Sequence, residues 1–244
     1  YYSSRSGDCI NYSDAEWYEM LTKAERMDEL INRHYAVPLN YGLADKMKLV
    51  IDAWGCWHPD GSGPSKGYNL FEQQSTMRDA VVAALSLNIF NNHCDKILLA
   101  TIAQLCNCDQ SLFLAEGDQC ICTPTYHVFD LYKEHQGGTA VYCYTDADKA
   151  DEAHKAPMVS SSVSIKEGVM TLTLANCSLT EEVQIDCDLC YFDAHEAAGL
   201  KIFGNGTHGH TDLGAVDQKS QQHDQQKNQN RSQDNNQLGL RTGN

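Results

Sequence analysis

Basic residues and long apolar runs are both scarce in this sequence. Only 18 Lys and Arg residues oppose 33 Asp and Glu residues, which gives the 244-residue chain a formal net charge of −15. That balance argues against nucleic acid or an anionic membrane surface as a partner, because both are themselves negatively charged. No stretch approaches the roughly 20 consecutive apolar residues that a membrane-spanning helix requires.

Several short motifs are missing as well. The sequence contains no secretory leader, no Gly-x-Ser-x-Gly motif, no P-loop and no dinucleotide fingerprint. It starts with Tyr1-Tyr2 and has no initiating Met, so we expect it to be cut from a longer protein. Its length allows one large domain or two ordinary ones.

Cysteine, in contrast, is abundant, with 11 residues. A chain of this size does not need disulfides for stability, so we expect most of them to be reduced thiols of a cytoplasmic protein. Three close pairs raise the alternative of zinc, namely Cys106-x-Cys108, Cys120-x-Cys122 and Cys187-x-x-Cys190. The first two pairs lie among Leu, Phe and Ile, where cysteine usually packs as a small hydrophobic residue, so we predict no metal site.

The first half of the chain alternates helix and strand signals. Helices are predicted at residues 13–35, 69–92 and 125–135, and strands at 46–51 and 96–102. This order is typical of a parallel α/β sheet, but two strands cannot make a sheet with both faces covered. A complete (β/α)8 barrel needs about 250 residues. We therefore predict that residues 1–136 are the last two or three βα units of a barrel.

A different pattern begins at Gly137. Residues 139–144, 159–176 and 181–192 alternate with a period of two and include a turn at Glu167-Gly168. Such alternation is typical of antiparallel strands in a β-sandwich.

The end of the sequence differs again. Residues 218–238 are almost wholly polar and rich in glutamine, so they are predicted to be disordered. The predicted fold class is therefore α/β plus all-β: C-terminal units of a (β/α)8 TIM barrel, a partial β-sandwich over residues 137–215 and a disordered tail over 216–244.

One strand end combines the residue types of a catalytic site with an inert residue. The apolar strand at 46–51 runs into Asp52-Ala53-Trp54, and Trp57 and His58 follow. Barrel enzymes hold their reactive groups at strand ends of this kind. Ala53 lies between the acid Asp52 and the aromatic Trp54, and its side chain has no reactive group.

Three segments carry a resemblance to a known family: "IDAWGCWH", "MRDAVVAALSLNIFNNHCDKILLATIAQLCN" and "TPTYHVFDLYKEHQGG". They resemble the C-terminal half of the retaining α-L-arabinofuranosidases of glycoside hydrolase family fifty-one. The similarity runs from Tyr1 to about residue 210 and is densest over 47–138. It implies a barrel followed by a sandwich, and an enzyme that removes terminal arabinofuranosyl groups from arabinan and arabinoxylan without a metal or other cofactor.

The resemblance implies a role for the position of Ala53. The family pattern at this strand end is Asp-Glu-Trp, in which the Glu is the catalytic nucleophile, so Ala53 occupies the nucleophile position. Retaining hydrolysis needs two carboxyl groups roughly 5–5.5 Å apart. The second, the acid/base, belongs to an earlier strand that would precede Tyr1, so we expect this chain alone to be inactive.

Three further positions match substrate-binding positions of the family. Tyr2 matches the tyrosine of a His-x-Tyr motif, Trp57 would stack on the sugar, and Gln104 would form a hydrogen bond with a sugar hydroxyl. The alternatives are a frayed terminus for Tyr2, a packed loop aromatic for Trp57 and, without the resemblance, a polar residue at a strand end for Gln104.

Other polar residues are given structural roles. Neighbouring strand residues point to opposite faces, so Asp52 should point away from the side of Ala53 and support the site by hydrogen bonding. His93 follows a helix at the opposite end of the next strand from Gln104, and we interpret it as structural. His208-x-His210 is expected to be solvent-exposed.

The unpaired edges of a partial barrel should also cause poor folding or self-association. Trp17, Leu21, Val81 and Leu85 are expected to face the space of missing barrel elements.

Three functions remain open from the sequence. The first is a piece of an α-L-arabinofuranosidase acting on arabinofuranosyl-containing oligosaccharides, whose intact parent is a candidate homo-oligomer. The second is a catalytically inactive relative that binds sugar or serves as a scaffold. The third is a truncated enzyme with an alanine introduced to trap substrate.

Overall fold

The computed structural model describes residues 2–59, 62, 71–189 and 198–199. The chain divides into two compact units, Tyr1–Ile185 and Asp186–Asn244. All helices and strands of the described residues belong to the first unit. The predicted polar tail and His208-x-His210 lie outside the described residues.

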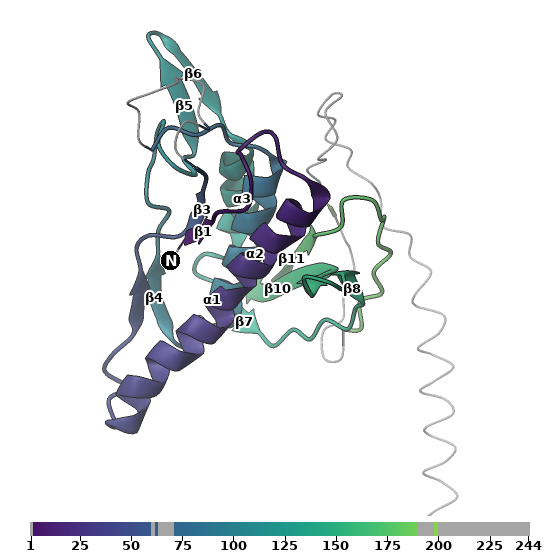
Figure 1. Ribbon diagram of the computed structural model, residues 1–244. Helices are drawn as coiled ribbons and strands as arrows, with labels where there is room; N and C mark the ends of the chain where they lie inside the picture. The colour runs from purple at the N-terminus through teal and green to yellow at the C-terminus, as the bar shows by residue number, and fades with distance from the viewer. Residues whose placement is uncertain (1, 60–61, 63–70, 190–197, 200–244) are drawn as a thin grey trace, which may run out of the picture. The chain divides into compact units, whose positions relative to one another are not determined.

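Two pairs of parallel strands form the N-terminal part of the first unit (Figure 1). The pairs are β1 (Tyr2–Ser4) with β3 (Gly55–Trp57), and β2 (Leu49–Ile51) with β4 (Ile97–Ala100). Parallel strands require a crossover, and helices supply it here. α1 (Asp14–Asn40) lies between β1 and β2 in the sequence, and α2 (Met77–Asn92) lies between β3 and β4. The predicted mixture of helices and strands is confirmed, and these four strands form two sheets of two strands each.

The first helix begins where the sequence predicts. The Ser13 hydroxyl accepts a hydrogen bond from the Glu16 amide, and the Glu16 carboxylate accepts one from the Ser13 amide at 2.7 Å. This reciprocal capping satisfies amides that the first helical turn leaves without partners. The helix continues five residues beyond the predicted end at residue 35, and Pro38 lies in its last turn.

The second helix begins later than predicted. Residues 71–76 are not helical, and α2 starts at Met77. The Asp79 carboxylate accepts hydrogen bonds from the Thr76 amide at 2.8 Å and from the Thr76 hydroxyl at 2.9 Å. The start at residue 69 was therefore wrong, because the Thr76-x-x-Asp79 capping pattern sets the boundary.

A third helix and an unpredicted hairpin complete this part. α3 (Pro124–Tyr132) has Pro124 in its first turn and continues into the 3-10 helix η1 (Lys133–His135). Before it, β5 (Phe113–Glu116) and β6 (Gln119–Cys122) form an antiparallel hairpin that projects beyond the helices in Figure 1. Cys120 and Cys122 lie exposed on β6, so the expectation that they pack as small hydrophobic residues was wrong.

The C-terminal part of the first unit contains antiparallel strands. They are β7 (Thr139–Val141), β8 (Lys149–Asp151), β9 (Ala156–Pro157), β10 (Val159–Lys166) and β11 (Val169–Asn176). β11, β10 and β7 form one sheet in that order, while β8 pairs with β9.

The long hairpin of that sheet turns where the sequence predicts. Glu167 and Gly168 have φ values of 52° and 80°, which suit a two-residue turn between β10 and β11. The third predicted strand, at 181–192, was wrong over residues 181–189, which contain no strand, while residues 190–192 lie outside the described part.

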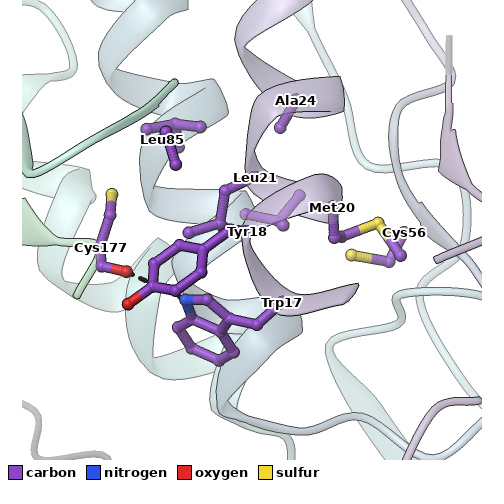
Figure 2. Packing of buried hydrophobic residues seen from close by; sticks show 10 residues of the cluster. Trp17, Tyr18, Met20, Leu21, Ala24, Cys56, Leu85 and Cys177 are labelled. Carbon is purple, nitrogen blue, oxygen red and sulfur yellow. Dashed lines mark hydrogen bonds between the residues drawn. The ribbon is translucent and has the colours of Figure 1, made fainter. Parts of the chain in front are cut away.

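One hydrophobic core joins the two ends of the first unit (Figure 2). Trp17, Leu21 and Leu85 are 5%, 0% and 0% exposed and pack with Cys56 of β3 and Cys177, which follows β11. The Trp17 indole N–H donates a hydrogen bond to the carbonyl of Cys177 at 3.0 Å. The expectation that Trp17, Leu21 and Leu85 face empty space was therefore wrong, as it was for Val81, which packs against this core.

The described residues contain no helix that is both long and apolar enough to cross a membrane.

Candidate functional site

The chain bends between β2 and β3, at the strand end that contains Ala53. β2 ends at Ile51 and β3 begins at Gly55, and Ala53 lies at the bend with a half-buried side chain. Gly55 has a φ of 118°, and a Cβ there would lie 2.6 Å from the Gln110 side-chain oxygen. Only glycine fits this conformation and this close approach.

Trp54 anchors the bend in the interior. Its side chain is 1% exposed and packs edge-on against Phe90 of α2, with ring centroids 5.1 Å apart. The ring of Phe129 of α3 stacks on it at 6.0 Å. Asp52, on the other side of Ala53, is exposed.

β3 presents Trp57 outward because its side chains alternate. Cys56 is fully buried, whereas Trp57 is 37% exposed. The open edge of β3 is occupied by two glutamine side chains. Gln73 accepts from the His58 amide and donates to the Cys56 carbonyl, both at 3.0 Å, and Gln110 accepts from the Cys56 amide at 2.7 Å. These contacts replace a neighbouring strand and fix the position of Trp57.

An aromatic cluster forms around Trp57, and we call Tyr2, Trp57 and Phe71 the aromatic platform. Trp57 packs edge-on against Tyr2, with centroids 5.1 Å apart, and against Phe71 at 5.5 Å. Two of the predicted sugar-binding residues, Tyr2 and Trp57, therefore touch each other. Phe71 was not identified from the sequence, because it fell inside the helix predicted for 69–92.

Two carboxylates influence the platform. The pKa of Tyr2 is raised, mainly by burial and further by the negative charges of Asp109 and Asp52. Burial also raises the pKa of Asp109, which is 7% exposed. Asp109 was another residue missed from the sequence, since it lies in a cysteine-rich loop without a recognisable motif.

Gln104 is not a member of the aromatic platform. It follows β4 by four residues, and its side chain is exposed. No hydrogen bond or ring contact between described residues connects it with Tyr2 or Trp57.

A buried polar network lies behind β3. Cys56, His58 and Asp79 place potential ligand atoms within 4.8 Å of one another, an arrangement that could hold a metal ion. However, Arg78 lies against the ring, with its guanidinium 3.2 Å from His58 Nδ1. Because arginine only donates, Nδ1 accepts, and Nε2–H donates to Asp79 at 3.1 Å. Hydrogen bonds and a neighbouring cation thus account for His58 and Asp79, and the Cys56 side chain packs in the hydrophobic core.

His93 forms a second structural cluster at the end of α2. Lys96 donates to His93 Nδ1 at 2.8 Å, so Nε2–H donates to the Asp28 carboxylate of α1 at 2.6 Å. These contacts connect the two long helices, which agrees with the structural role expected for His93.

Comparison with known proteins identifies the family. The profile described as "Alpha-L-arabinofuranosidase C-terminal domain" matches residues 52–240. An intracellular exo-α-L-arabinofuranosidase of Bacteroides ovatus is 32% identical over 81% of this chain and 39% of its own length. An intracellular exo-α-(1→5)-L-arabinofuranosidase of Halalkalibacterium halodurans is 23% identical over 80% of this chain and 40% of its own.

A solved structure gives the same result. The GH51 arabinofuranosidase from Xanthomonas axonopodis pv. citri aligns with a TM-score of 0.62 and 34% identity, over 72% of this chain and 37% of that one. The chain spans about two fifths of the length of the curated relatives it matches. With the family profile covering most of its length, the chain belongs to the α-L-arabinofuranosidase C-terminal domain family.

Proposed function

We propose that this chain recognises terminal α-L-arabinofuranosyl groups of oligosaccharides but does not hydrolyse them by itself. The observation that carries the proposal is the contact between Tyr2 and Trp57 beside the bend at Ala53. Both aromatic residues match sugar-binding positions of the family, and Ala53 matches its nucleophile. The names of the curated relatives, which are arabinofuranosidases, support this substrate class.

The proposed absence of hydrolysis follows from Ala53. In a retaining glycosidase one carboxylate attacks the anomeric carbon while a second carboxyl protonates the leaving oxygen. The methyl group of Ala53 can do neither. The exposed Asp52 would need to turn toward the sugar to replace it, and in our proposal it supports the site by hydrogen bonding instead. Gln104 belongs to the proposed site as a hydrogen-bonding residue for a sugar hydroxyl.

The architecture that we propose for the chain is that of the family. Residues 1–136 represent the last βα units of a (β/α)8 barrel, residues 137–215 part of a β-sandwich and residues 216–244 a polar tail. The parallel pairing of β1 with β3 and of β2 with β4 supports the barrel interpretation. We place the chain in the cytoplasm, as the intracellular relatives suggest by name.

Tryptophan fluorescence offers a direct test of sugar binding. Trp17 and Trp54 are 5% and 1% exposed, whereas Trp57 is 37% exposed, so a stacked sugar should change the emission of Trp57 alone. We expect α-1,5-linked arabinotriose to shift this emission in a saturable manner. Trp57→Ala should weaken binding, measured by calorimetry, by about tenfold, equivalent to about 1.4 kcal/mol.

A matched variant separates stacking from general surface effects. Tyr142 is 89% exposed and follows β7, so Tyr142→Ala should bind as the wild type does. Wild-type protein that does not bind arabinotriose, or Trp57→Ala that binds it unchanged, would overturn the proposal.

A further inference from the structure

Gln73 is a buried glutamine whose side chain bonds to the backbone on both sides of Trp57. Its carbonyl oxygen accepts a hydrogen bond from the His58 amide, and its amide nitrogen donates one to the Cys56 carbonyl, both at 3.0 Å. One side chain therefore holds the two residues that flank Trp57 in the chain. Because Gln73 is only 4% exposed, these hydrogen bonds form away from water, where they are stronger.

The contact takes the place of a neighbouring strand. Among the described residues, β1 is the only strand that pairs with β3, so the backbone groups along the other edge of β3 need different partners. A glutamine side chain suits this task, because it offers an acceptor and a donor side by side, as a peptide group does. Gln110 bonds to the Cys56 amide at 2.7 Å on the same edge, and Gln73 bonds to the two groups that flank Trp57.

Gln73 belongs to a segment that also contacts the Trp57 side chain. Phe71, two residues earlier, packs edge-on against the Trp57 ring, with centroids 5.5 Å apart. At the other end of the segment, the Thr76 amide donates a hydrogen bond at 2.8 Å to an acidic side chain in the first turn of α2. Residues 71–76 therefore connect α2 with both the backbone and the ring of Trp57.

The next residue is also a glutamine, but its contact is local. Gln74 is half-buried, and its amide nitrogen donates to the carbonyl of the adjacent Ser75 at 3.2 Å. Within the described part of the chain, no hydrogen bond connects Gln74 with β3. The two neighbouring glutamines thus differ in one respect that matters here, namely the paired contact of Gln73 with the residues on either side of Trp57.

We propose that Gln73 is a positioning residue for sugar recognition, whose paired hydrogen bonds hold the backbone of residues 56–58 so that the Trp57 ring is presented to the arabinofuranosyl group. Gln73 does not touch the sugar and acts through Trp57. The inference rests on the proposed function, because it needs a sugar stacked on that ring.

Two substitutions test the paired contact by calorimetry with α-1,5-linked arabinotriose. Gln73→Met keeps the length of the side chain and removes both hydrogen bonds, so it should bind about tenfold more weakly at every pH. In Gln73→Glu, an ionised carboxylate can accept from the His58 amide but cannot donate to the Cys56 carbonyl, whereas a protonated carboxyl group can do both. We therefore expect Gln73→Glu to bind weakly at pH 8 and to regain affinity as the pH falls to 5.5, since burial favours the protonated form.

The emission of Trp57 provides a readout without sugar. Trp17 and Trp54 are 5% and 1% exposed, so quenching by acrylamide reports mainly on Trp57. Loss of the paired contact should loosen the backbone around Trp57 and raise the quenching constant in Gln73→Met, and in Gln73→Glu at pH 8. Gln74→Glu, which places the same charge one residue further along, is the matched control and should keep the wild-type affinity and quenching at both pH values.

The possible outcomes separate this inference from the proposed function. Wild-type affinity of Gln73→Met, while Trp57→Ala is weakened, would overturn the role of Gln73 alone. Binding by Gln73→Glu that is equally weak at pH 8 and 5.5, or a similar loss in Gln74→Glu, would show a general structural effect and also overturn it. Absence of binding by the wild type would overturn the proposed function as well.

Discussion

At the scale of single residues, Arg78 is the side chain on which most of the buried polar contacts behind β3 depend. Its guanidinium donates to the carbonyls of Ser6 and Asp8, both at 2.7 Å, and lies 3.7 Å from the centre of the Tyr12 ring. We predict that Arg78→Met lowers the free energy of unfolding by about 3 to 5 kcal/mol, because buried acceptors lose a charged donor. Urea denaturation measures the change.

Arg33 provides the matched control for this prediction. Its side chain is 70% exposed and pairs with Glu29 at 3.3 Å on the same helix. Such pairs contribute little, so Arg33→Met should change the free energy of unfolding by less than about 0.5 kcal/mol. Similar losses for both variants would contradict the assigned role of Arg78.

The sequence pointed to some residues of the candidate site and missed others that pack beside them. Tyr2 and Trp57 were identified through the family motifs, and they touch in the structure. Phe71 and Asp109 reach the same place through loops, whose paths are set by glutamine contacts to β3 rather than by local periodicity. The sugar-binding roles of Tyr2, Trp57 and Gln104 and the roles of Ala53 and Asp52 remain predictions.

At the scale of elements, His135 joins η1 to the long hairpin. Its Nδ1 lies 2.8 Å from the Ser164 hydroxyl of β10, and Nε2 lies 3.1 Å from the Thr173 hydroxyl of β11. Burial lowers the pKa of His135. Below about pH 6.5, the ordinary value, the unfolded chain therefore takes up the proton more readily than the folded chain. The stability provided by neutral His135 is fully present above this pH and is lost as the pH falls toward the lowered value.

A comparison of variants isolates this effect from that of other titrating groups. Between pH 7.5 and 5.5, the wild type should lose stability more steeply than His135→Gln, by at most about 1.4 kcal/mol per pH unit. His34→Gln, at an exposed position of α1, should retain the wild-type slope. Parallel profiles for the wild type and His135→Gln would contradict the prediction.

Elements with strong local signals were predicted best. Capping and apolar periodicity located α1, Pro124 located the start of α3, and the Glu167-Gly168 turn located the long hairpin. β1 and β3 have three residues each and β5 and β6 have four, which is too short for a recognisable alternation. Residues 181–189 alternate in sequence but form no strand, because a strand also requires a neighbour with unpaired backbone groups.

At the scale of the whole molecule, exposed apolar side chains gather on the β2–β4 pair. Val50, Leu98 and Leu99 are 54%, 73% and 50% exposed. Uncovered strands with apolar side chains promote association, so we predict that the apparent mass in light scattering rises with protein concentration. Leu98→Lys should reduce this rise without lowering the melting temperature.

The control for self-association lies on the sheet formed by β11, β10 and β7. Val169, at the start of β11, is 65% exposed, and Val169→Lys should leave the association unchanged. A monomer at every concentration would contradict the prediction.

The core was not predictable from the sequence, because Trp17 and Cys177 are 160 residues apart and meet only in the folded chain.

The central claim is that this arabinofuranosidase-family chain lacks its own means of hydrolysis, and release of p-nitrophenolate from p-nitrophenyl α-L-arabinofuranoside tests it most directly. Because we propose that Ala53 occupies the nucleophile position, we predict that the purified chain releases none above the buffer rate, while an active retaining arabinofuranosidase does so in the same assay. Sustained release that survives repurification, and that Asp52→Asn abolishes, would contradict the claim and assign the catalytic carboxylate to Asp52.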